Sequence, residues 1–246
     1  MGMSDFTVSA NAVTNASQND QVGGAPQTAT TYANKGTAVS PQLTDECVSD
    51  FVALLASREP VPGGGGAAAL AGALAAALGM MVVNLTSGKK KYEHVQAELD
   101  ECAAQGALLQ HVFEELIHKD AQAFTPLAQA YGIPRENPDR EALLEQALIV
   151  AAEPPLEMMR AASSTIALLE RIEKIGSSLV ISDAGVGASL ARAALESAAL
   201  NVLVNTTLMR DRVKATELER EVALIMDEWH DRADQIYVRV KERVSS

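Results

Sequence analysis

The uncharged stretch 67–86 is the feature that most constrains how this chain can fold. It follows the glycine run Gly63–Gly66 and consists mainly of alanine, glycine and leucine. The stretch is long enough to cross a membrane. However, it ends in polar residues, and the sequence contains no second stretch of this kind. We therefore expect a helix buried in a protein core and no membrane partner.

Three glycines in this region, Gly65, Gly72 and Gly79, recur every seven residues. Seven residues are close to two turns of an α-helix, so these glycines lie near one face. A face without side chains lets another helix approach closely. The spacing therefore predicts tight helix–helix packing along this element.

Composition and periodicity favour a fold made only of helices. Aromatic residues are 4% of the chain, with a single Trp, whereas sheets are enriched in aromatic and β-branched residues. The apolar spacing from about residue 44 onwards predicts an all-α, up-and-down bundle of about six or seven helices. Residues 1–40 have no such period and are expected to form a flexible N-terminal tail, and 41–246 a single helical domain.

Three local predictions concern helix boundaries. Pro154–Pro155 should interrupt a helix, because proline lacks the backbone N–H that the helix needs. Residues 179–181 should be short and extended. Ser182 should then cap the next helix with its hydroxyl.

Charge and cysteine usage exclude several classes of protein. The formal net charge is −12, which argues against nucleic acid as a partner. The two cysteines cannot form a disulfide framework or a cysteine-type zinc site, and the four histidines form no H-x-x-x-H pair. No basic n-region with an apolar h-region opens the chain. We expect a cytoplasmic protein without a bound metal.

Asp120 is the strongest candidate for a catalytic group. It falls in the apolar stripe of a helix predicted from Lys89 to about Tyr131, between Leu116 and Phe124. A carboxylate in such a stripe loses water on folding, which raises its pKa towards the range that proton transfer requires. Two alternatives remain open: an Asp tied to a backbone amide or an Arg, and a stripe that has reached the surface by this turn.

Asp183 is the second candidate carboxylate, although an acid in the first turn of a helix also simply stabilises that helix. Eighteen residues are five turns, so Asn201 lies on the same side of the helix as Asp183, and Asn205 follows one turn later. The spacing indicates a polar network inside the bundle. It leaves open whether that network serves a ligand or another helix.

Two further segments could bind an anionic ligand. The glycine run Gly63, Gly64, Gly65 and Gly66 precedes a helix, where backbone N–H groups could hold an anion or a flat ligand, although the run could equally be a hinge. Lys89, Lys90 and Lys91 form the one basic cluster of the sequence. They could bind carboxylates or phosphates, or form a solvated helix start.

Taken together, these residues resemble the cyclodeaminase/cyclohydrolase family of tetrahydrofolate enzymes. The resemblance covers about residues 44–240. Its carriers are the segments 62–66, 84–86, 88–92, 120–124, 131–134, 181–186 and 199–202. Their common order along the chain makes the match specific.

The resemblance implies an all-α homodimer with folate in a cleft lined by the glycine loop. It also places the Asp120 motif at the folate site and implies a tetrahydrofolate derivative as substrate, with no separate cofactor. Family members convert 5-formiminotetrahydrofolate to 5,10-methenyltetrahydrofolate and ammonia, or hydrolyse the methenyl compound to 10-formyltetrahydrofolate. The residues expected to bind substrate are the four glycines, the three lysines, Asn201 and Asn205.

The chain departs from the family pattern at positions that favour one of these reactions over the other. Gly66 stands where cyclodeaminases carry Ser, and the short N-terminal tail leaves no room for a fused transferase domain. Both features favour a stand-alone methenyltetrahydrofolate cyclohydrolase over a formiminotetrahydrofolate cyclodeaminase. Gln122 replaces a family Glu, which keeps open a third possibility, a non-catalytic helical protein that binds folate or another partner.

Overall fold

The computed structural model describes residues 43–44 and 46–246, and here the chain is all-α, as predicted. Six α-helices and one 3-10 helix follow one another along the sequence. They are α1 (Val48–Leu55), α2 (Gly64–Thr86), η1 (Lys90–Val95), α3 (Gln96–Gly132), α4 (Arg140–Ile175), α5 (Ile181–Leu208) and α6 (Arg212–Ser245). The predicted tail, residues 1–40, lies outside the described residues, so the boundary at residue 41 stays a prediction.

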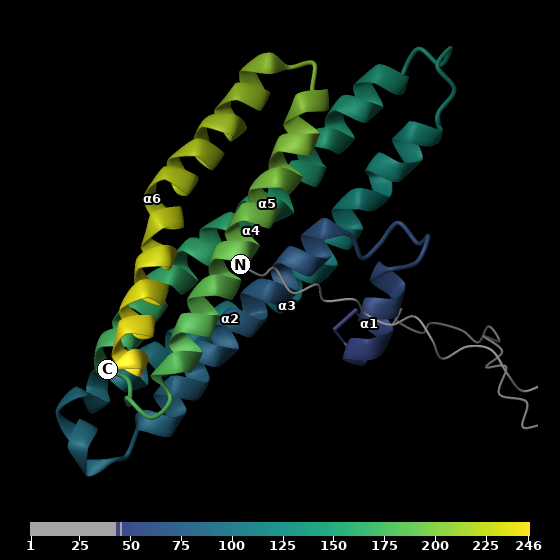
Figure 1. Cartoon of the computed structure of the whole chain (residues 1–246). Helices are drawn as coiled ribbons and strands as arrows, with labels where there is room; N and C mark the ends of the chain where they lie inside the picture. Colours follow the sequence, from purple (N-terminus) through teal and green to yellow (C-terminus); the bar gives the residue numbers. More distant parts are fainter. Residues whose placement is uncertain (1–42, 45) are drawn as a thin grey trace, which may run out of the picture. The chain divides into compact units, whose positions relative to one another are not determined.

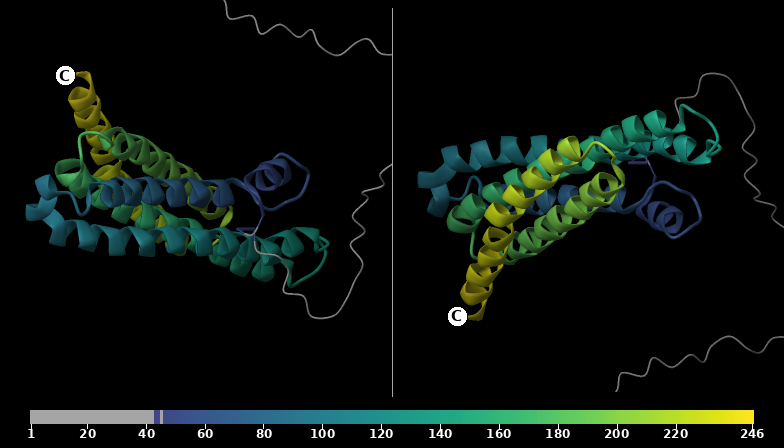
Figure 2. Two further views of the ribbon diagram at one scale, coloured as in Figure 1. Left: turned by 90° about the horizontal axis from the view of Figure 1, so that it is seen from below. Right: turned by 90° about the horizontal axis from the view of Figure 1, so that it is seen from above.

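The five long helices form an up-and-down bundle (Figure 1). Helix α2 packs against α3, α4 and α5, and α6 packs on α5 and α4. Figure 2 shows α2 and α3 side by side along most of the length of α2, with α6 inclined to them. The uncharged helix α2 therefore packs against three of the other four long helices.

The glycine face of α2 is used for close packing, as the seven-residue spacing predicted. A methyl group added to Gly72 would overlap the ring of Phe113, which is fully buried on α3. A methyl group on Gly79 would lie 3.1 Å from Leu169 and Ile172 of α4. The missing side chains thus let two neighbouring helices insert bulky residues against the α2 backbone.

Helix α2 is a core helix. Among the described residues it is the one helix long and apolar enough to cross a membrane by length and composition. More than half of its most apolar window is nevertheless buried against the other helices. The burial confirms the prediction of a core element.

The three local boundary predictions were wrong. Helix α4 continues through Pro154 and Pro155 without a break. Residues 178–180 form a turn, and α5 begins at Ile181, after Val180, with no side-chain cap, so Ser182 is already inside the helix. Packing against neighbouring helices outweighs the local proline and capping preferences here.

Candidate active site

A cleft opens where α2 begins. Its walls come from the glycine loop before α2, the second half of α3, Ala151 and Pro155 of α4, and the end of α5. The lining residues are Pro60, Val61, Gly63, Gly64, Gly65, Asp120, Phe124, Leu127, Ala151, Pro155, Asn201, Val204 and Asn205. Asp120 is the one ionisable residue among them.

Asp120 reaches from α3 to the first turn of α2. A methyl group on Gly65 would overlap its carboxylate, so only glycine allows this approach. The backbone of Gly66 provides a hydrogen bond to the carboxylate. The N-cap residue Gly63 offers no side chain to the free N–H groups of the first turn. Asp120 thus supplies, from another helix, the negative charge that a helix N-terminus favours.

The environment of Asp120 alters its acidity. Burial among apolar side chains raises its pKa, and the hydrogen bond from Gly66 lowers it by less. The result is a pKa raised from 3.8 to about 6. A carboxyl group with this pKa can both accept and return a proton near neutral pH. Desolvation shifts this pKa in the direction that the place of Asp120 in an apolar stripe predicts.

Asn201 and Asn205 stand side by side on the α5 wall. Asn201 donates from Nδ2 to the carbonyl of Ser197 at 2.8 Å, and Asn205 donates to the carbonyl of Asn201 at 2.8 Å. Asn201 and Asn205 both line the cleft that holds Asp120, whereas Asp183, the third member of the predicted polar network, does not.

The other predicted site residues, the three lysines and Asp183, lie at the opposite end of the helical bundle within the same chain. Lys89, Lys90 and Lys91 follow the last residue of α2, about 30 Å along that helix from Gly65. Asp183 is in the first turn of α5, about 27 Å along the helix from Asn201. Figure 1 shows η1 and the start of α5 together at this end of the bundle. Within one chain, neither the lysines nor Asp183 belongs to the Asp120 cleft.

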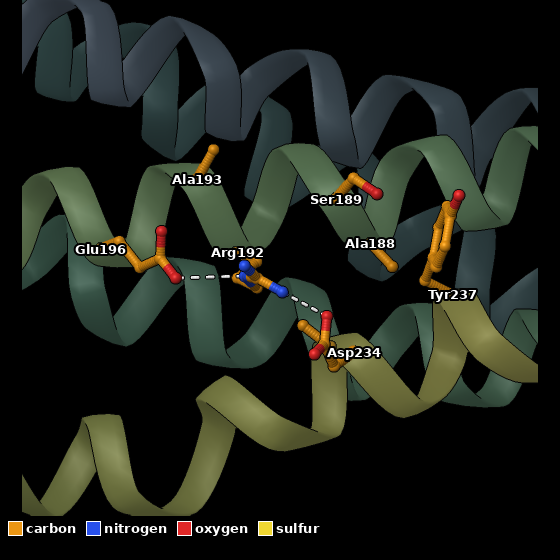
Figure 3. A pocket seen from close by; sticks show the side chains of 8 residues that line it. Ala188, Ser189, Arg192, Ala193, Glu196, Asp234 and Tyr237 are labelled. Atoms are coloured by element: carbon orange, nitrogen blue, oxygen red, sulfur yellow. Dashed lines mark hydrogen bonds and ion pairs between the residues drawn. The ribbon is translucent and has the colours of Figure 1, made fainter. Parts of the chain in front are cut away.

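A second hollow, between α5 and α6, differs from the Asp120 cleft in being lined by several charged residues (Figure 3). Its charged groups are already paired: Arg192 bridges Glu196, at 3.1 Å, and Asp234. In the described part of the chain, no three His, Cys, Asp or Glu side chains gather as a metal site, here or elsewhere. The cleft at the start of α2 is therefore the better candidate for chemistry.

Gln122, the departure from the family pattern, lies outside the cleft. Its side chain is exposed and lines a shallow surface hollow with Lys119, Glu153 and Pro154. Sequence reasoning missed Pro155, which lines the cleft from α4. The sequence does contain a signal for it. The helical spacing of apolar residues continues on both sides of Pro154–Pro155, which indicates one continuous helix that contains both prolines.

The fold and this cleft define a helical protein with one partly buried carboxyl group at a glycine-rich helix start. The chain belongs to the formiminotransferase-cyclodeaminase family, whose model matches residues 47–224. This match confirms the family resemblance identified from the sequence motifs.

Individual relatives agree with this assignment. A methenyltetrahydrofolate cyclohydrolase of Methylorubrum extorquens is 40% identical over 205 residues, which cover 82% of this chain and 99% of that protein. The mouse formimidoyltransferase-cyclodeaminase is 27% identical over 76% of this chain, but this chain matches only 35% of its length. The crystal structure of a Thermotoga maritima formiminotetrahydrofolate cyclodeaminase superposes with a TM-score of 0.72, at 28% identity, over 82% of this chain and 98% of that chain.

The raised pKa of Asp120 predicts a pH-dependent free energy of unfolding. Because the folded chain binds this proton more tightly than the unfolded chain, the contribution of Asp120 to stability falls as pH rises from about 4 to above 6. The amide of the Asp120→Asn variant cannot ionise. Between pH 4 and pH 8, the free energy of unfolding of this variant should therefore increase by about 2–3 kcal/mol relative to that of the wild type. Urea denaturation at both pH values measures the gain. A difference between the two proteins that does not change with pH would contradict this assignment.

Proposed function

We propose that this chain is a cytoplasmic methenyltetrahydrofolate cyclohydrolase, which hydrolyses 5,10-methenyltetrahydrofolate to 10-formyltetrahydrofolate. The observation that carries the proposal is the single carboxyl group of the cleft, Asp120, with a pKa of about 6 at the start of a glycine-rich helix. The 40% identity to the Methylorubrum extorquens cyclohydrolase over nearly its whole length supports the same reaction.

Asp120 supplies the proton transfers that the hydrolysis needs. Its carboxylate takes a proton from the water that attacks the methenyl carbon between N5 and N10, which gives a neutral tetrahedral carbinol. The protonated carboxyl then returns that proton to N5 as the bond between carbon and N5 breaks. The carbinol hydroxyl loses its proton to solvent and becomes the formyl oxygen on N10. One group serves as base and then as acid because its pKa lies near the working pH.

The alternative reaction is that of a formiminotetrahydrofolate cyclodeaminase. The solved Thermotoga maritima relative carries that name and superposes over most of this chain. Both reactions pass through a tetrahedral carbon bound to N5, so the same carboxyl group could serve either. Loss of the methenyl absorbance, measured beside ammonia release from formiminotetrahydrofolate, distinguishes them.

The substrate also needs contacts beyond this cleft. The cleft volume is about 150 Å³, below the roughly 300–1,000 Å³ of pockets that enclose drug-sized ligands. Exposed apolar side chains lie on α2 and α5, among them Leu74 and Met81 of α2 and Val186, Val204 and Leu208 of α5, and Val204 lines the cleft. We propose that the face formed by these side chains makes a homodimer, since helix α2 carries no charged residue and so large an apolar face favours burial.

A two-fold axis across the middle of this face would bring the far end of one subunit over the cleft of the other. Helices α2 and α5 are antiparallel. The lysine cluster, which follows the end of α2, therefore lies at the end of the bundle far from the cleft, near the start of α5. We propose that the partner's Lys89, the partner's Lys90 and the partner's Lys91 bind the glutamate tail of the folate. The partner's Asp183 would approach the same cleft.

Asp120→Asn should lower kcat by about 10²–10⁴-fold, which is about 3–5 kcal/mol of barrier at 1.36 kcal/mol per tenfold, because the amide cannot transfer the proton. Binding of the substrate should change little. In the wild type, kcat should fall below about pH 6 as Asp120 becomes protonated. Asp183→Asn should give a mixed, smaller loss of binding and rate. If Asp183→Asn abolishes turnover in a folded protein while Asp120→Asn stays active, the two roles are reversed.

Replacing Lys89, Lys90 and Lys91 with Ala should raise KM more for polyglutamylated than for monoglutamylated substrate, and less at high salt. The control Lys214→Ala removes a lysine paired with Glu217 on α6 and should leave both KM values unchanged.

Hybrid dimers test whether the lysines act across the interface. When the triple-lysine variant is co-expressed with Asp120→Asn, each mixed dimer should contain one intact site, made of Asp120 from one subunit and the lysines of the other. This site should restore the low KM for polyglutamylated substrate. If the lysines act within their own subunit, no hybrid site is intact and the high KM persists. A protein that sediments as a fully active monomer contradicts the dimer.

A further inference from the structure

Pro155 leaves a backbone carbonyl of α4 without its helical partner. In an α-helix, the N–H of each residue bonds to the carbonyl four residues earlier, and proline has no N–H. Pro155 therefore cannot bond to the carbonyl of Ala151, although α4 continues through both positions. Both residues line the Asp120 cleft.

Asn205 of α5 supplies the missing hydrogen bond. Its Nδ2 donates to the Ala151 carbonyl at 3.3 Å and to the Asn201 carbonyl at 2.8 Å. Both neighbours of this end of the amide are carbonyl oxygens, so it must be the NH₂ end, and both of its protons are used. In the part of the chain that the structure describes, no group donates to the other end, Oδ1. The side chain is only 8% exposed and lines the cleft.

We infer that Asn205 is a specificity residue. Pro155 helps to hold its amide so that only the oxygen is free for a ligand, and this oxygen accepts a hydrogen bond from an N–H group of the substrate. This inference rests on the proposed function and names the donor as the exocyclic amino group of the pterin ring. Pro155 is a positioning residue: it frees the carbonyl that locks the amide. In the free protein this oxygen is open to water, since no buried side-chain polar atom lacks a partner among the described residues. Once a ligand covers it, an acceptor without a donor is costly, so a ligand that lacks the amino group is rejected.

The neighbouring proline provides a matched control. Pro154 frees the carbonyl of Val150, which Asn205 does not contact, and its side chain lines the outer hollow beside Gln122. Pro155→Ala restores an N–H for the Ala151 carbonyl. This N–H competes with the Asn205 amide for that carbonyl, so the amide is held less firmly, although the Asn201 carbonyl still keeps the NH₂ end on this side. Pro154→Ala makes the same chemical change one residue away and leaves the amide locked.

The test measures the affinity of 5-formyltetrahydrofolate and of its 2-desamino analogue by calorimetry. The wild type and Pro154→Ala should bind the parent compound at least about tenfold more tightly than the analogue. Asn205→Leu, which has a similar volume, should bind the two compounds nearly equally. Pro155→Ala should discriminate between them less than the wild type does. In both variants, KM for methenyltetrahydrofolate should rise more than kcat falls, unlike in Asp120→Asn.

Equal affinities in the wild type, or a preference that is undiminished in Asn205→Leu and in Pro155→Ala, would overturn the inference. If Asn205→Leu does not fold, the comparison of Pro155→Ala with Pro154→Ala decides alone. A wild type that discriminates between the ligands but does not hydrolyse methenyltetrahydrofolate contradicts the proposed function and leaves this inference standing. A wild type that binds neither compound contradicts both.

Discussion

The contact between Asp120 and the first turn of α2 links the packing of this bundle to its chemistry. A carboxylate can approach this turn only because Gly65 has no side chain. The same contact takes the carboxylate out of water, and the hydrogen bond from Gly66 only partly compensates for the lost hydration. The glycine run therefore does more than bend the chain, since it admits a destabilised acid whose pKa lies near neutral.

The opposite wall of the cleft depends on a second unusual backbone feature. A proline in the middle of a helix normally costs about 3 kcal/mol or more, partly through the lost hydrogen bond. Here the Asn205 amide replaces that bond from α5, so α4 continues and the amide is fixed in place. In both walls, a backbone irregularity on one helix is satisfied by a polar side chain from another. Each of these side chains faces the cleft.

Periodicity predicted which residues share a helix face, but not how far apart they lie in the folded chain. It identified Asp120 as a carboxylate in an apolar stripe, and it grouped Gly65, Gly72 and Gly79 on one packing face. It also grouped Asp183 with Asn201, and the helix separates these two by about 27 Å. The sequence predicts a break at Pro154–Pro155 because Asn205, whose amide compensates for Pro155, is far away in sequence and becomes its neighbour only after folding.

The central claim is that Asp120 is a proton-transfer group because the fold holds its pKa near neutral. Carbon-13 NMR of protein labelled in its aspartate carboxyl carbons, titrated from about pH 3 to pH 9, measures this pKa directly. The loss of one signal in Asp120→Asn assigns the resonance. The structure predicts a midpoint of about 6 for this signal. A midpoint near the ordinary aspartate value of about 3.9 would contradict the account.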